Sequence, residues 1–181
     1  MVVALEPADR KPEAGPSWRA ALCGVFGVIF CALVPTTSWA DLRMVVIDED
    51  QLPYELGPSR YENSPTNYDN SPTNYDNSAT NYDNSPTNYD NSASNYDNGE
   101  SSGRTLRGDR GERLGYYVLS EEGVINFYTG SPARRVAFLP SDGHTQSAFS
   151  EGGWCGVLGN IDGETVLALS QTCFYRFLLD G

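Results

Sequence analysis

The chain has few side chains that can move protons near neutral pH. Its only histidine is His144, which lies in one short segment with Asp142 and Ser147, the three residue types of a hydrolase triad. A triad needs these groups to converge from separate elements beside an oxyanion hole. Here all three share one loop, and no nucleophile-elbow motif is present. We therefore predict no catalytic residue and a non-enzymatic protein, and we keep an envelope hydrolase that uses His144 as an alternative.

Metal and cofactor motifs are also missing from the sequence. Neighbouring carboxylates occur at Glu121 and Glu122, and again at Asp162 and Glu164, but both pairs lie in turn sequences where acidic residues are usually solvated. The Asp-Asn-Ser triplets of residues 61–98 offer oxygen ligands to calcium, yet no turn glycine or clustered carboxylate accompanies them. We predict no metal and no cofactor.

The four cysteines divide into two pairs. Cys23 and Cys31 belong to an apolar run, whereas Cys155 and Cys173 belong to the C-terminal part of the chain. In an oxidising compartment such a pair is most simply a disulfide, so we predict the bond Cys155–Cys173. Free thiols or a zinc site are the alternative, although two cysteines and one distant histidine leave a zinc site incomplete.

The N-terminal residues have the pattern of a signal peptide. Arg10, Lys11 and Arg19 precede the apolar run 20–34, and the polar stretch after it ends with small residues, Ser38 and Ala40, at the −3 and −1 places of a cleavage site. The run is shorter than the roughly 20 residues that span a bilayer. We predict cleavage after Ala40, export to the periplasm or the medium, and no stable membrane span after cleavage. An uncleaved anchor and a buried helix are the alternatives.

Residues 61–98 repeat one seven-residue phrase, as in YDNSPTN. A period of seven suggests a coiled coil, but a heptad needs two apolar positions and here only tyrosine is large and partly apolar. The odd period also puts successive tyrosines on opposite faces of any continuous strand. Each unit instead favours a turn around Asn-Ser-Pro-Thr, as at 70–73. Because the apolar content is low, we predict a largely disordered spacer. The candidate contact residues are its tyrosines, which could stack on sugar rings or on each other: Tyr61, Tyr68, Tyr75, Tyr82, Tyr89 and Tyr96.

The phrase NSPTNY, at 63–68, 70–75 and 84–89, resembles the tandem NSPxNY-type repeats of uncharacterised exported bacterial proteins. In those proteins the repeat precedes a small domain rich in glycine and aromatic residues. The resemblance covers the repeat and the beginning of the C-terminal domain, and it implies no activity.

The other segments complete the expected organisation. A signal peptide at 1–40 is followed by an N-terminal segment, 41–60, with one plausible strand at 42–47 that could pair with the C-terminal domain across the repeat. Residues 99–113 form a Gly/Ser/Arg linker. Residues 114–181 consist of short Val-, Tyr-, Phe- and Leu-rich runs separated by turn sequences, which predicts a small all-β domain, an antiparallel barrel or sandwich. Its last run, at 173–179, is predicted to be a strand that Cys173 joins to the strand containing Cys155.

The charge restricts the class of partner. Acidic residues outnumber basic ones by 24 to 12, so phosphate-rich nucleic acids and anionic lipids would be repelled. We predict an exported, non-enzymatic β binding module on a flexible spacer. Its partner is unknown; a cell-envelope polymer and another envelope protein are the candidates. The alternative is a structural protein that self-associates through the tyrosine repeat.

Overall fold

A computed structural model describes residues 6–7, 40–141 and 143–179. The predicted apolar run with Cys23 and Cys31, and most of the predicted signal peptide, lie outside the described residues, as does Asp142. From the N-terminal part only β1 (Glu6–Pro7) is described, and its backbone pairs antiparallel with Gly159 and Asn160. None of the helices within the described ranges is long and apolar enough to cross a membrane.

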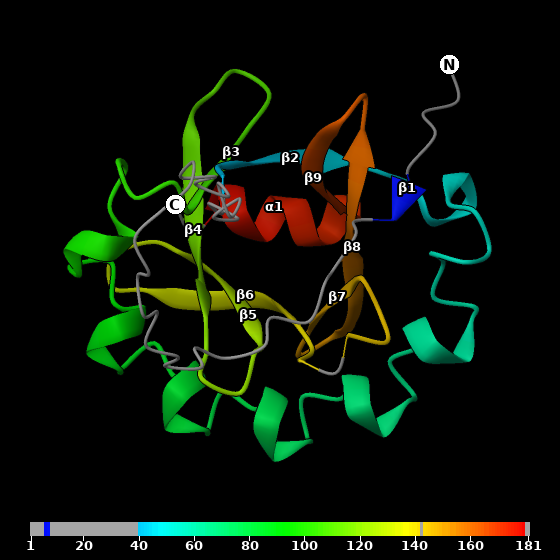
Figure 1. The fold of residues 1–181 in the computed structure, drawn as a ribbon, viewed down its shortest axis with the longest axis horizontal. Helices are drawn as coiled ribbons and strands as arrows, with labels where there is room; N and C mark the ends of the chain where they lie inside the picture. The colour runs from blue at the N-terminus through cyan, green and yellow to red at the C-terminus, as the bar shows by residue number, and fades with distance from the viewer. Residues whose placement is uncertain (1–5, 8–39, 142, 180–181) are drawn as a thin grey trace, which may run out of the picture.

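Eight strands, β2 to β9, form a closed barrel (Figure 1). The order around the barrel is β2-β3-β4-β5-β6-β7-β8-β9, and β9 returns to β2. The predicted all-β class is therefore confirmed, and of the two predicted architectures the barrel is the one formed. The strands are β2 (Leu42–Val46), β3 (Thr105–Arg107), β4 (Arg113–Leu119), β5 (Ile125–Thr129), β6 (Arg134–Leu139), β7 (Ser147–Ser150), β8 (Gly153–Ile161) and β9 (Glu164–Leu169).

Strand β2 precedes the repeat in the sequence, but it closes the barrel by pairing with two strands that follow the repeat. It runs parallel to both β3 and β9, with Leu42 opposite Leu106 and Met44 opposite Leu167. All the other neighbouring strands are antiparallel. The strand predicted at 42–47 is thus confirmed, together with its pairing to the C-terminal strands.

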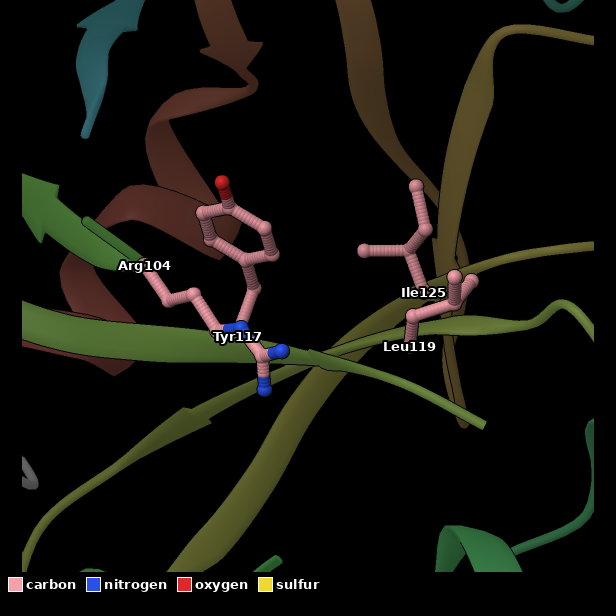
Figure 2. Close-up of a pocket in the computed structure, with 4 residues that line it drawn as sticks. All are labelled: Arg104, Tyr117, Leu119 and Ile125. Atoms are coloured by element: carbon pink, nitrogen blue, oxygen red, sulfur yellow. The ribbon is translucent and has the colours of Figure 1, made fainter. Parts of the chain in front are cut away.

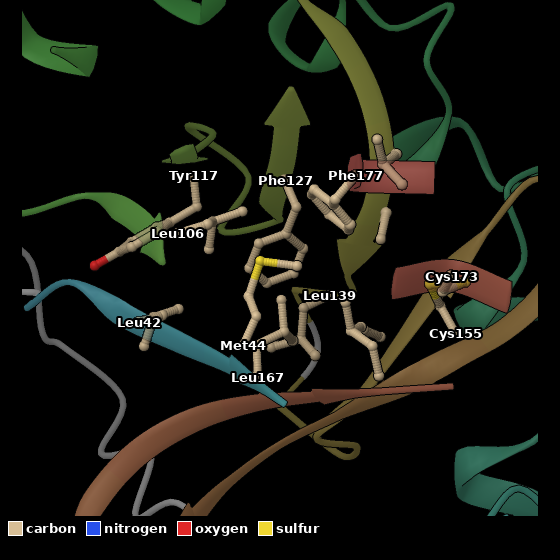
Figure 3. Packing of buried hydrophobic residues seen from close by; sticks show 14 of the residues in the cluster. Leu42, Met44, Leu106, Tyr117, Phe127, Leu139, Cys155, Leu167, Cys173 and Phe177 are labelled. Carbon is tan, nitrogen blue, oxygen red and sulfur yellow. A yellow bond between two sulfur atoms is a disulfide. The ribbon is translucent and has the colours of Figure 1, made fainter. Parts of the chain in front are cut away.

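The barrel interior is filled by side chains. Met44, Leu106, Phe127, Leu139 and Leu167 are fully buried and meet at its centre (Figure 3). Strands β8 and β9 approach closely at Gly156, where a Cβ atom would collide with the carbonyl oxygen of Ala168. The interior is therefore a packed core.

The C-terminal run predicted as a strand is instead a helix, α1 (Gln171–Leu179). Ser170 follows β9 and begins the helix, because its hydroxyl accepts a hydrogen bond from the N–H of Cys173 at 3.4 Å. Cys173 and Phe177, four residues apart, are both buried in the core, while Tyr175 and Leu179 are exposed. The helix contacts strands on several sides of the barrel (β2, β4, β6, β8 and β9), so it covers one end of it (Figure 1). The residue types of this run suit a strand as well as a helix, and the four-residue spacing of Cys173 and Phe177 is its helical signal.

The predicted disulfide is confirmed. Cys155 on β8 is bonded to Cys173 on α1, with a Cα–Cα distance of 5.5 Å. It therefore fastens the helix to the barrel, rather than joining two strands. The neighbouring Trp154 packs against a separate cluster formed by Val124, Phe138 and Phe149.

The predicted linker 99–113 contributes to the barrel. Strand β3 lies within it, and Arg107 donates from Nε to Asp41 at 2.7 Å, which joins β3 to the start of β2. Burial by itself raises the pKa of Asp41, but the hydrogen bonds from Arg107 and from the Thr105 N–H outweigh burial and lower it. The folded unit thus includes β2 and β3, well before the predicted boundary at 114.

The repeat is ordered, which corrects the prediction of a disordered spacer. Residues 61–98, called the belt from here on, curve around the outside of the barrel (Figure 1). Each unit contains one short 3-10 turn that starts at a tyrosine. A further turn of this kind, η1 (Glu49–Gln51), precedes the belt. The belt turns are η2 (Tyr61–Asn63), η3 (Tyr68–Asn70), η4 (Tyr75–Asn77), η5 (Tyr82–Asn84), η6 (Tyr89–Asn91) and η7 (Tyr96–Asn98).

Candidate functional site

Each belt unit folds as two successive turns. In the unit 71–77, the carbonyl of Ser71 accepts from the N–H of Asn74 at 3.1 Å, across Pro72 and Thr73. The carbonyl of Asn74 then accepts from the N–H of Asn77, also at 3.1 Å. The predicted proline turn therefore exists, one residue further along than expected. Proline fits because its fixed φ suits the second position of the turn.

The asparagine that ends each turn ties its unit to the one before. Asn77 donates from Nδ2 to the carbonyl of Asp69 at 2.6 Å and to that of Ser71 at 3.3 Å. The same two bonds, to the residues eight and six positions earlier, recur at every unit, and these asparagines are buried. They are Asn63, Asn70, Asn77, Asn84, Asn91 and Asn98. Because backbone carbonyls facing the barrel need partners, this side-chain ladder replaces a strand ladder.

The barrel holds the same asparagines from the other side. Long polar side chains on β6, β5 and β4 reach their backbone carbonyls, so successive units dock on the same strand or on the next one. The donors are Arg135 of β6 to Asn77 at 2.7 Å, Tyr128 of β5 to Asn84 at 2.8 Å, Tyr116 of β4 to Asn91 at 2.8 Å, and Arg113 of β4 to Asn98 at 2.9 Å. Earlier in the belt, Thr145 donates to Oδ1 of Asn63 at 2.8 Å.

Burial under the belt changes the ionisation of these donors. It raises the pKa of Tyr116 to about 12 and raises that of Tyr128 further, so both phenols keep the protons that they donate. Burial also lowers the pKa of Arg135 to about 10, which leaves the guanidinium charged at neutral pH. Its carbon lies 4.5 Å from the centre of the Phe138 ring, a cation–π contact.

The predicted contact tyrosines all point away from the barrel. Five of them expose 62 to 65% of their surface, and the last, Tyr96, exposes 81%. The near-constant value follows from the repeated turn, which gives every ring the same surroundings. A continuous strand with a period of seven would place successive tyrosines on opposite faces. Because the units are turns, the tyrosines lie in one row.

The tyrosine row is acidic. The belt contains no lysine or arginine, and an acidic residue follows each tyrosine: Glu62, Asp69, Asp76, Asp83, Asp90 and Asp97. Glu62 pairs with Arg60 at 2.9 Å. Asp83 shares a hydrogen bond with Glu122, which raises the pKa of Asp83. The row therefore offers aromatic faces beside hydrogen-bond acceptors and repels anions.

Of the residues considered for catalysis, the described ones, His144 and Ser147, have different surroundings. His144 is exposed in the loop before β7, whereas Ser147 is buried and its hydroxyl accepts from the indole N–H of Trp154 at 3.2 Å. Glu164 pairs with Arg43 at 3.0 Å. Within the described residues no cluster of three or more metal-ligating side chains occurs.

Two small hollows mark the described surface near the end of the belt. One of about 50 Å³ is lined by Arg104, Tyr117, Leu119 and Ile125 (Figure 2). The other, of about 150 Å³, is lined by Tyr96, Asp97, Ser101, Ser102 and Arg104. Both are smaller than the roughly 300 to 1,000 Å³ of a drug-sized ligand pocket.

Sequence reasoning identified the tyrosines but missed the groups that hold them. The asparagine that follows Tyr-Asp in five units was the available signal, since an amide with two donors can bind two carbonyls. The barrel donors carried no such signal, because Tyr116, Tyr128 and Arg135 are far from the belt in sequence. No family model, curated protein or solved structure matches the chain. The candidate site therefore rests on the geometry of these residues.

Proposed function

We propose that the protein is an exported, non-enzymatic binding module whose belt holds an extended glycan chain against its row of tyrosines. The observation that carries the proposal is the equal exposure of consecutive tyrosines on a hydrogen-bonded scaffold. Rings held in a row at fixed orientation are preorganised, so binding does not have to order them. A polymer with a repeating ring suits such a row better than a single small molecule does.

The chemistry beside each ring supports a glycan. A sugar offers an apolar ring face for stacking and hydroxyls for hydrogen bonds. Each tyrosine has a carboxylate after it, and the asparagine before it in five units uses its Oδ1 to accept from a backbone N–H, as Asn74 does from Asp76 at 3.2 Å. Because the belt has no cation, anionic polymers are disfavoured. The expected ligand is therefore a neutral or amine-bearing polysaccharide.

Affinity electrophoresis of the purified protein in gels containing soluble neutral polysaccharides tests the proposal. We expect retardation by at least one of them, and we expect Tyr75→Ala combined with Tyr82→Ala to weaken it by tenfold or more, since each aromatic contact contributes about 0.5 to 1.5 kcal/mol. Tyr75→Phe with Tyr82→Phe keeps the rings and should keep binding.

Tyr175 provides the matched control, because it is an exposed tyrosine on α1 outside the belt. Tyr175→Ala should leave retardation unchanged. Equal loss for Tyr175→Ala and for the belt variant would contradict a binding role for the row.

Self-association through the same tyrosines is the second candidate, and the same exposed row motivates it. It predicts a molar mass that rises with concentration in light scattering and falls to that of a monomer in the Tyr75→Ala, Tyr82→Ala variant. A constant monomer mass would eliminate it.

Export rests on the N-terminal pattern and agrees with the disulfide, since such bonds persist in oxidising compartments. Mass spectrometry of protein recovered from the periplasm or the medium should find a chain that begins at Asp41. A chain beginning at Met1 would refute the predicted cleavage.

A further inference from the structure

The belt ends beside a polar hollow. Its lining combines the last tyrosine of the row, Tyr96, and the acidic residue after it, Asp97, with Ser101, Ser102 and Arg104 from the segment that leads into β3. Tyr96 is the most exposed tyrosine of the belt, because no further unit follows it. The hollow therefore lies at the end of the tyrosine row, next to its last ring.

Arg104 differs from several arginines near the barrel. Arg43, Arg60 and Arg107 each form a salt bridge, and Arg113 donates to the carbonyl of Asn98. Among the described residues, the guanidinium of Arg104 forms no salt bridge and donates no hydrogen bond, although the chain carries a net charge of −12. Its backbone is held in place, since its N–H donates to the Ser102 hydroxyl at 3.1 Å. The guanidinium of Arg104 thus brings a fork of donors to the hollow for a ligand.

The lining groups match one sugar ring. The tyrosine offers a stacking face, the arginine donates, the carboxylate accepts, and the serine hydroxyls do both. A volume of about 150 Å³ is small for an extended chain. A terminal sugar differs from an internal one because it has a free hydroxyl where an internal ring continues into the next glycosidic bond.

We propose that this hollow is a terminal subsite, which binds the end sugar of the glycan that lies along the tyrosine row. The inference rests on the proposed function and adds direction to it: the chain end is held at Arg104, and the chain extends along the belt toward Tyr61. The polar hollow beside the exposed Tyr96 is the observation that distinguishes this end of the belt.

Calorimetric titration with cellohexaose, maltohexaose and chitohexaose tests the subsite. For whichever hexasaccharide binds, we expect Arg104→Met to weaken binding by about tenfold, because a hydrogen bond from a charged donor is lost. Ser101→Ala removes an exposed hydroxyl at little risk to folding and should weaken binding severalfold. Arg110→Met is the matched control, an exposed arginine of the same segment outside the hollow, and should bind as the unaltered protein does.

A second comparison tests end recognition directly. If maltohexaose binds, α-cyclodextrin, which has the same six sugars and linkage but no end, should bind at least tenfold more weakly. Unchanged affinity in Arg104→Met and Ser101→Ala, with binding still lost in the Tyr75→Ala, Tyr82→Ala variant, would overturn the subsite and leave the tyrosine row standing. Failure of every hexasaccharide and polysaccharide to bind would overturn the proposed function, and the subsite with it.

Discussion

The barrel and the belt are both ordered, but different forces hold them. The barrel buries Met44, Phe127 and Leu167 completely and is fastened by a disulfide. The belt buries asparagines instead, and the barrel reaches it with hydrogen bonds such as the one from Tyr128 to Asn84, beside an apolar contact at Ala93. Apolar burial stabilises a fold by itself. A hydrogen bond has a net contribution of only about 0.5 to 1.5 kcal/mol, because water competes for both partners.

The difference implies a one-way dependence. Ordering a residue opposes folding by about 1 to 2 kcal/mol, which the bonds within an isolated belt unit do not offset. The folded barrel supplies the remaining stabilisation, since Arg135 and Tyr128 on its outer face donate hydrogen bonds to the belt. We therefore expect the belt to require the barrel, while the barrel survives local loss of the belt.

The most disruptive change should be Phe127→Ala, at the centre of the barrel. We expect a loss of about 3 to 5 kcal/mol in the free energy of unfolding, because the cavity is fully enclosed. Urea denaturation followed by tryptophan fluorescence reports on the barrel, and amide exchange reports on the belt. The barrel and the belt should lose their structure in the same transition. Belt amides that stay protected in an unfolded barrel would break the proposed dependence.

Removal of the disulfide should have the next largest effect. Cys155→Ala with Cys173→Ala opens a loop with a sequence separation of 18 residues and should lower the free energy of unfolding by about 3 kcal/mol. Reduction of the unaltered protein should give a similar loss. A much smaller loss would mean that packing alone holds α1 on the barrel.

The belt should be weakened locally by Asn84→Ala. This change removes two bonds to earlier carbonyls and one from Asn126, so we expect a loss of about 1 to 3 kcal/mol in local opening free energy, measured by amide exchange. Asn74→Ala is the control, because the Asn74 side chain accepts a single hydrogen bond, from the Asp76 N–H, and lies in the same repeat. Barrel amides should be unaffected in both. Equal effects of the two variants would contradict the role of the asparagine ladder.

Acid should act on the barrel at Asp41, where β2 begins. The pKa of this carboxyl is lower in the folded than in the unfolded protein, so its contribution is present above its ordinary pKa of about 3.9 and is lost as pH falls through the folded value. Since the pair with Arg107 is partly exposed, we expect an effect below about 1 kcal/mol. Asp41→Asn should flatten the dependence of unfolding on pH below about 4. An unchanged pH profile would assign the acid sensitivity to other carboxyls.

Tyr82→Ala should have the smallest effect on stability. Because most of its ring is exposed to solvent, the free energy of unfolding should change by less than about 0.5 kcal/mol. Thermal denaturation measures this. A large loss would show that the tyrosines support the belt, which would weaken the argument that they are held outward for a ligand.

Much of the barrel could be read from the chain. Except for the last one, the apolar runs after residue 114 form strands, as the turn sequences between them indicated. The predicted strand near Leu42 forms as well, and it makes the pairing with the C-terminal strands that the sequence raised as a possibility. The run at 173–179 was misread because its residues are as common in strands as in a short amphipathic helix. Strand β3 was missed because its three residues lie in a Gly- and Arg-rich segment.

Local chemistry alone therefore determined the disulfide, the β class, the turn in each repeat and the spacing of the tyrosines. Only tertiary structure decided whether the repeat would be ordered, because the bonds of one unit do not offset its loss of entropy. Order arises where Tyr116, Tyr128 and Arg135, brought to neighbouring strands by the closed barrel, meet the carbonyls of successive units. The same contacts turn a period of seven, which would alternate the tyrosines along a strand, into a single outward-facing row.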